Sequence, residues 1–344
     1  MSSIPSPMAT GRLNALRWDG QPDHYEVWYL SLTDRASGCG VWIRYTMVAP
    51  SDGGQATASL WLMAMEPDGN GAPIGRKATW PADALTARAE PFELRIADAV
   101  LTEGGADGAF EDVAWSLSWA PDPHPAEHVH PLLQRARVAK TVLVLPQPDL
   151  AISGSVRWGD RELALDGARG GQAHIWGSKH ANRWAWVHCN DLETVAGEPR
   201  RGDYVDGVSV FVPRFGRELG PNTPVVGRFA GEEFRSTNPV RVNGNPSTFA
   251  LSSWDFEARD GKRRIAVDVD APRDTLVGVT YTDPDGELAY CYNSEVASLR
   301  CRAYQRDRAE PTGWRLVETL VAPGRAHFEY AQREPVPGLA LQVR

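Results

Sequence analysis

The side chains with the greatest potential for chemistry are concentrated in one stretch, residues 170–191. It begins Gly-Gly-Gln-Ala-His-Ile-Trp-Gly (170–177), continues through a polar gap, Ser-Lys-His-Ala-Asn (178–182), and ends Arg-Trp-Ala-Trp-Val-His-Cys-Asn-Asp (183–191). Imidazole and carboxyl groups can transfer protons, and indole rings can line a pocket for an apolar molecule. The stretch therefore predicts a binding site that contains acid–base groups.

If residues 183–190 form a strand, successive side chains point to opposite faces. One face then carries large or hydrogen-bonding groups and the other carries small apolar ones. His174 and Trp176 show the same spacing on the preceding strand, so we expect six such side chains to converge on the lumen of a barrel. The alternative is ordinary core packing, but His and Asn gathered opposite an apolar face favour a lined interior. The two faces of 183–190 are Trp184, Trp186, His188 and Asn190 on one side, and Ala185, Val187 and Cys189 on the other.

The elements that must position this stretch are predicted to be strands. Glycine (32) and proline (26) recur throughout, and the segments between them are short and rich in Val, Thr, Trp and Tyr. Pro-Asp-Gly turns at 67–69 and 284–286 are expected at hairpin tips. Helices are expected only at 131–140 and 295–303. The predicted strands are 24–32, 40–48, 59–65, 112–119, 140–145, 183–189, 208–212, 275–282 and 326–332.

This organisation predicts an all-β fold of two consecutive lipocalin-like antiparallel β-barrels or sandwiches with few short helices. One closed barrel needs about 150 residues, so a chain of 344 residues suggests two. We place the N-terminal barrel, with the motif of 170–191, at residues 1–200 and the C-terminal barrel at 201–344.

Composition excludes several classes of protein. With 42% hydrophobic residues and 13 Trp, the chain has enough apolar surface for a core, which excludes a disordered chain. A net charge of −8 gives no basic footprint for nucleic acid. No apolar run is long enough to span a membrane or to form a signal peptide, and the four cysteines are scattered, so we expect a cytoplasmic protein. Signatures of nucleotide or flavin cofactors are absent, so no cofactor is expected.

The motif of 170–191 resembles a known family. His-Ile-Trp-Gly, a short polar gap and then Trp-Ala-Trp-Val-His-Cys-Asn is similar to the tocopherol cyclase signature, an Asn-Trp-Gly followed by a W-x-W-x-Q-C-N strand. The H-x-W pair also resembles that of bacterial carotenoid 1,2-hydratases. Both belong to a lipocalin-like superfamily of two consecutive β-barrels that includes fungal Diels–Alder cyclases. His188 stands where the tocopherol cyclases have glutamine, and His174-Ile175 where they have asparagine next to the tryptophan.

What the resemblance implies is cofactor-free protonation of an isoprenoid double bond, followed by cyclisation or capture of water. The candidate acids are His174, His188 and Asp191, with Asp191 ranked last because it faces away from His188 on a regular strand. Trp176 and Trp186 would stabilise a carbocation. Trp184 would line the site, and Asn190 would orient a substrate hydroxyl or the acid.

Other clusters are weaker candidates. His124, His128 and His130 are expected in a solvated loop. A zinc site from His174, His180, His188 and Cys189 is disfavoured, because Cys189 should face away from His188, and no metal is expected. His327 and Glu329 share one face of a strand, either as an acid–base pair or, preferably, as a satisfied surface pair. Arg44 must be exposed or paired, with Glu26 as a conceivable partner.

The sequence therefore predicts an enzyme that acts on an apolar isoprenoid or polyketide-like small molecule by acid-assisted cyclisation, hydration or isomerisation. The alternative from another class is a non-catalytic carrier of hydrophobic molecules on the same fold. An enzyme should lose turnover when His174 or His188 is removed, whereas a carrier should lose little affinity.

Overall fold

The computed structural model describes residues 8–67, 72–129, 140–214, 217–238 and 241–343. Almost all of the regular structure in these ranges is β-strand, as the sequence predicts. One short helix and three 3₁₀ turns complete it: α1 (Met8–Asn14), η1 (Ala82–Ala84), η2 (Val242–Gly244) and η3 (Arg273–Thr275).

The first half of the chain forms a curled antiparallel sheet of 12 strands within the described residues. Its strands follow the order β4-β3-β2-β1-β12-β11-β9-β8-β7-β6-β5, and β10 pairs with β11 at the side. Sheet neighbours are mostly chain neighbours, and the one long-range closure is the pairing of β1 with β12. The bounds are β1 (His24–Thr33), β2 (Gly40–Ala49), β3 (Thr57–Met65), β4 (Ile74–Pro81), β5 (Leu85–Ala89), β6 (Phe92–Ile96), β7 (Ala99–Thr102), β8 (Gly105–Phe110), β9 (Val113–Ser118), β10 (Ala126–Glu127), β11 (Thr141–Trp158) and β12 (Arg161–Gly177).

The second half forms another sheet, with 13 strands in the described part of the chain and the main order β18-β17-β15-β13-β24-β23-β21-β20-β19. β22 pairs with β23, and the last strand, β25, adds to β22 in parallel. The bounds are β13 (Arg183–Cys189), β14 (Glu193–Thr194), β15 (Tyr204–Arg214), β16 (Arg217–Asn222), β17 (Val225–Phe229), β18 (Glu232–Ser236), β19 (Ser247–Ala250), β20 (Ser253–Asp260), β21 (Arg263–Asp270), β22 (Val277–Thr282), β23 (Leu288–Arg306), β24 (Trp314–Gln332) and β25 (Leu341–Val343).

Alternation along the strands builds three apolar clusters. On β2, Val41, Ile43 and Tyr45 point into a core enclosed by the first sheet. Trp42 points the other way, into a cluster shared by both sheets, which we call the inter-sheet layer. The second sheet encloses a core of its own. Because both faces of β1 to β3 are covered, these strands are buried along nearly their whole length.

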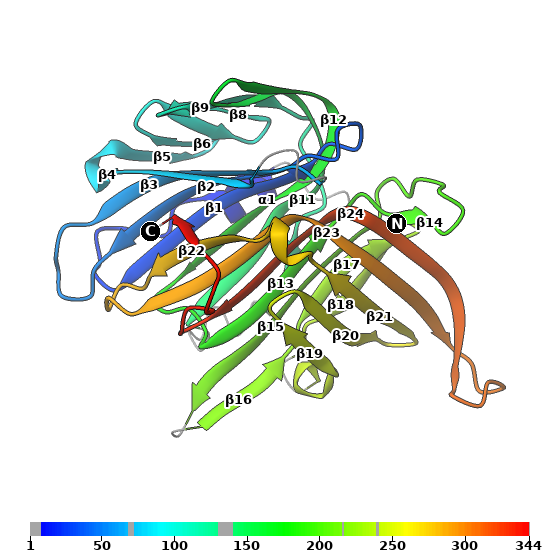
Figure 1. Cartoon of the computed structure of the whole chain (residues 1–344). Coiled ribbons are helices and arrows are strands. Elements are labelled where there is room, and N and C mark those ends of the chain that lie inside the picture. Colours follow the sequence, from blue (N-terminus) through cyan, green and yellow to red (C-terminus); the bar gives the residue numbers. More distant parts are fainter. Residues whose placement is uncertain (1–7, 68–71, 130–139, 215–216, 239–240, 344) are drawn as a thin grey trace.

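The two sheets pack through this layer, with β1 to β4 of the first against β22 to β25 of the second (Figure 1). Two contacts show how closely side chains at the end of β13 approach the backbone of β12. A Cβ at Gly171 would lie 2.7 Å from Nε2 of His188, so any larger residue there would force the His188 side chain to move. Asn190 donates its Nδ2 to the carbonyl oxygen of Gly170 at 2.7 Å and so ties β13 to β12.

The structure confirms one of the predicted turns and contradicts one of the predicted helices. Pro284-Asp285-Gly286 forms the tip of the β22–β23 hairpin, as expected. The second turn, at 67–69, lies partly outside the described residues, and the helix expected at 131–140 lies almost wholly outside them. The helix expected at 295–303 is wrong, because these residues belong to β23, where Ala297, Leu299 and Cys301 point into the second core.

The chain passes from the first sheet to the second between Gly177 and Arg183, so the motif strand 183–189 belongs to the second sheet. The domain boundary at 200 concerns domains rather than sheets and stays a prediction. No helix in the described ranges is long and apolar enough to cross a membrane.

Candidate functional site

A groove of about 430 Å³ opens between the two sheets at one end of the inter-sheet layer. Its walls are the face of β2 to β4 that points away from the first core, and the β22–β23 hairpin of the second sheet. Tyr25, Trp61 and Tyr281 give it aromatic walls, and hydroxyl groups of several threonines and serines give it a polar rim. It therefore suits a small molecule with an apolar body and polar substituents.

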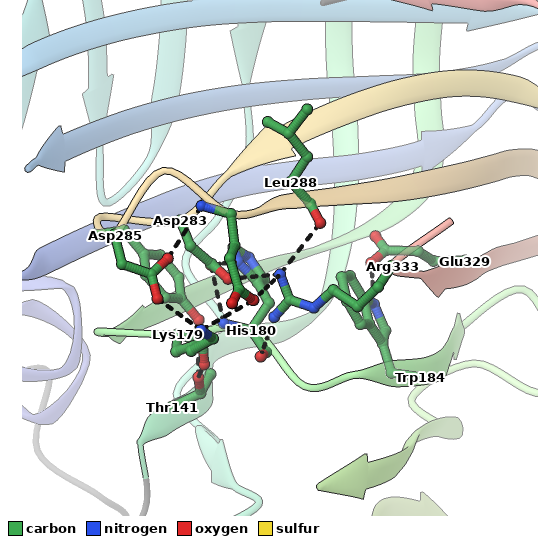
Figure 2. Close-up of polar contacts among 11 residues, drawn as sticks. Thr141, Lys179, His180, Trp184, Asp283, Asp285, Leu288, Glu329 and Arg333 are labelled. Carbon is green, nitrogen blue, oxygen red and sulfur yellow. Dashed lines mark hydrogen bonds and ion pairs between the residues drawn. The ribbon is translucent and has the colours of Figure 1, made fainter. Parts of the chain in front are cut away.

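His180 and Asp283 meet on the wall of this groove (Figure 2). Nδ1 of His180 lies 2.6 Å from Oδ1 of Asp283, and the backbone N–H of His180 donates to the same oxygen at 3.0 Å. The carboxylate side chain is fully buried, whereas 14% of the His180 side chain is exposed. Burial alone raises the pKa of Asp283, but the hydrogen bonds from His180 and Arg333 hold it below its ordinary value.

The imidazole of His180 is also fixed by stacking. Its ring lies 4.4 Å from that of Tyr25 at an interplanar angle of 14°, and 5.4 Å from that of Trp184 at 17°. Since Nδ1 is held by Asp283, the ring presents Nε2, for which the described residues supply no hydrogen-bond partner. An imidazole oriented by a carboxylate at one nitrogen is suited to proton transfer at the other.

The surrounding contacts hold His180 where the chain crosses between the sheets. Lys179 pairs with Asp285 at 2.6 Å and with Glu287 at 2.9 Å, both in the β22–β23 hairpin. Arg333 donates Nη1 to Oδ2 of Asp283 at 2.7 Å and Nη2 to the carbonyl oxygen of His180 (Figure 2). The crossing segment is therefore fastened to the turn that supplies the carboxylate.

The structure does not bring the two predicted histidines together. His174 faces the first core, stacked on Trp28 at 4.6 Å. Its Nε2 contacts Glu26 at 2.8 Å and its Nδ1 contacts the carbonyl oxygen of Leu13 at 2.6 Å, so both nitrogens are occupied. Trp176, beside it, is half-buried under the guanidinium of Arg17. The expected convergence of six side chains on one lumen is therefore wrong, because 174 and 176 point to the opposite side of β12 from 188.

The alternation predicted for 183–190 is confirmed, but its two faces are exchanged. The small residues Ala185, Val187 and Cys189 fill the second core. Trp184 and Trp186 lie in the inter-sheet layer. Two faces can be separated from period-2 spacing, but which one meets the barrel interior depends on the partner sheet.

His188 lies deep in the inter-sheet layer rather than on the groove wall. Its Nδ1 contacts Asp206 at 3.0 Å, and His128 contacts the other carboxylate oxygen at 2.7 Å. Trp186 donates to Asp206 at 3.3 Å. Burial alone raises the pKa of Asp206, but the hydrogen bonds from the two histidines hold it below its ordinary value.

The remaining predicted residues make structural contacts. Asp191 is paired with Arg35 at 2.6 Å and with Arg325 at 3.0 Å. All the contacts of the Asn190 amide nitrogen go to β11 and β12. Trp184 alone among them contacts the groove histidine, and its Nε1 donates to Glu329 (Figure 2). The roles assigned to these residues stay predictions.

The structure also places several of the weaker candidates differently from the prediction. His128 is buried, so the solvated loop expected for it is wrong, whereas 46% of the His124 side chain is exposed. His130 lies outside the described residues. His327 is buried and bonded to Glu295 at 2.6 Å rather than to Glu329, which is half-buried, so the surface pair expected on this strand is wrong.

The zinc alternative and the proposed ion pair of Arg44 are not supported either. Cys189 faces the second core and His174 faces the first, so neither reaches His188. No group of three or more metal-ligating side chains is found in the part of the chain that the structure describes. Glu26 binds His24 and His174 instead of Arg44.

The comparisons with known proteins agree with this architecture. No family model matches the chain. The protein Rv0493c of Mycobacterium tuberculosis strain H37Rv, described as uncharacterized, is 31% identical over 284 residues, which cover 82% of each chain. The chain belongs to the family of this mycobacterial protein. Its counterpart in strain CDC 1551, MT0513, matches to the same extent.

Solved structures show that this family shares its fold with proteins of low sequence identity. A Nitrosomonas europaea protein described as AttH (NE1406) superposes with a TM-score of 0.56 at 12% identity, over 90% of this chain and 93% of its own. CghA in complex with Sch210972 gives 0.56 at 11%, over 90% and 88%. Kievitone hydratase from Nectria haematococca gives 0.52 at 9%, over 94% of each chain. The all-β, two-sheet fold is thereby confirmed.

Sequence reasoning missed the pair on the groove wall. From the sequence, His180 is a candidate zinc ligand only, and its segment 178–182 is a polar gap between the motif strands. Asp283 was not singled out, although it directly precedes the Pro-Asp-Gly turn at 284–286. A histidine in a short crossing segment and a carboxylate at a hairpin tip were the available signals. The two residues are 103 positions apart in the sequence, so only the tertiary structure brings them into contact.

Proposed function

We propose that this protein is a cofactor-free enzyme that transfers a proton to or from a small molecule bound in the groove between the sheets. The observation that carries the proposal is the His180–Asp283 pair, with Nδ1 held by a buried carboxylate and Nε2 left for a ligand. The reaction class is hydration, cyclisation or isomerisation, which needs a positioned acid or base and no external redox partner. The fold relationship to a protein named a hydratase supports this class by analogy.

The chemistry follows from the geometry of the pair. Nε2 of His180 takes a proton from the substrate or from a water molecule beside it, and Asp283 stabilises the imidazolium while remaining ionised. In the following step the same proton returns to the product, so the protein is regenerated. The stacked rings of Tyr25 and Trp184 keep the imidazole from rotating during the transfer.

The substrate is proposed to place an apolar body, such as an isoprenoid- or polyketide-like skeleton, against Tyr25, Trp61 and Tyr281. These rings form the apolar walls of the groove, and burial raises the pKa of the Tyr25 and Tyr281 phenols above their ordinary value. The hydroxyl-rich rim would meet the polar substituents of the same molecule.

The test is turnover of a panel of unsaturated small molecules by the wild type and by His180→Gln. Mass spectrometry would follow gain or loss of water and changes of retention at constant mass. Glutamine keeps polarity and approximate length but cannot act as a base, so the loss of turnover is expected to be at least about 10²-fold. His124→Gln, whose side chain is exposed outside the groove, is the matched control.

Equal turnover by wild type and His180→Gln would overturn the proposal. Tight binding of panel members without any conversion by the wild type would favour the alternative, a non-catalytic carrier. Conversion that disappears with His174→Gln or His188→Gln but not with His180→Gln would return the acid–base role to the motif strands.

A further inference from the structure

Arg44 is a buried cation that forms no ion pair within the described part of the chain, and it lies on the wall of the groove. It projects from β2 into the inter-sheet layer and is only 5% exposed. Its guanidinium forms no hydrogen bond or ion pair with any residue in the described ranges, and its enclosed Nε has no partner. A buried charge in this state is costly, so proteins normally pair it.

Aromatic rings hold the guanidinium in place. Its central carbon lies 4.0 Å from the ring centre of Tyr281, 5.4 Å from that of Trp42 and 5.5 Å from that of Trp61. Cation–π contacts fix the position of a guanidinium while its N–H groups stay available to an acceptor. The cost of burial is thus only partly offset, and the planar donor fork remains open to a ligand.

The carboxylates around the groove have other partners, and Asp52 accepts the backbone N–H of Gly54 at 2.9 Å. Asp283 accepts from His180 and Arg333, and Asp285 pairs with Lys179. Burial raises the pKa of the nearby Glu329, although the Trp184 indole N–H that its carboxyl accepts and the charge of Arg44 both act to lower it. None of them forms an ion pair with Arg44.

A second cation adds to the positive potential. The ammonium of Lys77 lies 4.3 Å from the ring centre of Trp61 and also lines the groove. Burial, and after it the charge of Arg44, lowers the pKa of Lys77, which shows that the two cations share one electrostatic environment. An anion entering the groove would relieve this repulsion.

We propose that Arg44 binds an anionic oxygen group of the substrate, and that the substrates are therefore ring-containing small molecules bearing a carboxylate, phenolate or enolate. The inference rests on the proposed function and deepens it. His180 also stacks on Tyr281, with ring centres 5.6 Å apart, so one molecule lying against Tyr281 can reach both the cation and the base. Negative charge that develops on an oxygen when His180 removes a proton would be stabilised by the guanidinium.

The test compares 2-naphthoate with its neutral analogue 2-naphthamide by calorimetric titration. The wild type is expected to bind the naphthoate at least about ten-fold more tightly, because a charged hydrogen bond to a desolvated guanidinium exceeds a neutral one. Arg44→Gln should abolish the preference, and Arg44→Lys, which keeps the charge but not the planar fork, should retain part of it.

Two controls make each outcome decisive. Arg76→Gln removes an arginine of β4, in the same sheet, that is paired with Asp112 outside the groove, and it should keep the full preference. Near-ultraviolet circular dichroism checks that Arg44→Gln is folded, and Arg44→Lys keeps the test valid if it is not.

Equal affinity of the wild type for the two probes, no binding of the naphthoate, or an unchanged preference in Arg44→Gln would each overturn the anion site. His180→Gln should retain the preference, since it leaves Arg44 in place. If His180→Gln loses turnover but the wild type shows no preference for the naphthoate, the anion site is wrong and the proposed function is still supported.

Discussion

Asp283→Asn should uncouple the pair on the groove wall without changing its shape. Both contacts from His180, through Nδ1 at 2.6 Å and through the backbone N–H at 3.0 Å, go to Oδ1, whereas Arg333 donates to Oδ2 at 2.7 Å. An asparagine has one acceptor oxygen and one NH2 group. Whichever way the amide is turned, it sets a donor against a donor, either at Arg333 or at the backbone N–H of His180.

The size of the effect follows from this count. One buried hydrogen bond to a charged group is lost and its donor is left unsatisfied, which costs about 2 kcal/mol of the free energy of unfolding. If the amide turns its NH2 towards His180, Nδ1 becomes the acceptor and the ring proton moves to Nε2. The imidazole then cannot accept a proton from a ligand, so turnover should fall by about 10²–10⁴-fold.

Two assays read these effects independently. Urea unfolding at pH 7 gives the change in free energy, and long-range ¹⁵N–¹H NMR correlations of the imidazole give the tautomer of His180 without any substrate. Asp285→Asn is the matched control, because that carboxylate lies in the same turn but forms a surface pair with Lys179, worth at most about 1 kcal/mol. A variant Asp283→Asn as stable as the wild type and with the same tautomer would show that Asp283 neither anchors Arg333 nor orients His180.

Two further predictions concern the inter-sheet layer. The pKa of Asp206 is held below its ordinary value by the hydrogen bonds from His128 and His188, despite burial, so the stabilisation is complete above the unfolded-state pKa of about 3.9 and is lost as pH falls below it. Asp206→Asn should therefore lower the urea midpoint at pH 7 and flatten its decline between about pH 4 and 3; an unchanged midpoint would contradict this. Gly171→Ala places a Cβ 2.7 Å from Nε2 of His188 and 3.1 Å from the carbonyl oxygen of Pro148, which should cost about 1–3 kcal/mol in the same assay. Gly244→Ala, whose Cβ meets nothing within 4 Å, is its control, and equal stability of the two variants would show that the sheets do not approach as described.

The strand pattern was predictable because it depends on local spacing. Trp184 and Trp186 separate from Ala185 and Val187 by alternation alone, and the hairpin at 284–286 follows from its turn residues. The helix expected at 295–303 is wrong although the local spacing carried the strand signal, since buried Ala297, Leu299 and Cys301 alternate with the more exposed Ser298, Arg300 and Arg302.

The site was less predictable because it is made by the packing of one sheet on the other. The sequence shows that Arg44 lies in a strand and has no local partner, so it must be exposed or paired elsewhere. It does not show that Arg44 lines a groove. His128, in a proline-rich loop, is drawn into the interior by Asp206, which lies in the other sheet. No property of either residue's neighbours in the sequence indicates such a contact.

The central claim, that His180 is the proton-transfer group, is tested most directly by chemical rescue. His180→Gly would be assayed on the first compound that the wild type converts, with and without added imidazole. We expect turnover to be lost, and imidazole to restore part of it in proportion to its concentration by occupying the space between Tyr25 and Trp184. Turnover by His180→Gly at the wild-type rate without imidazole would show that His180 is not the proton-transfer group.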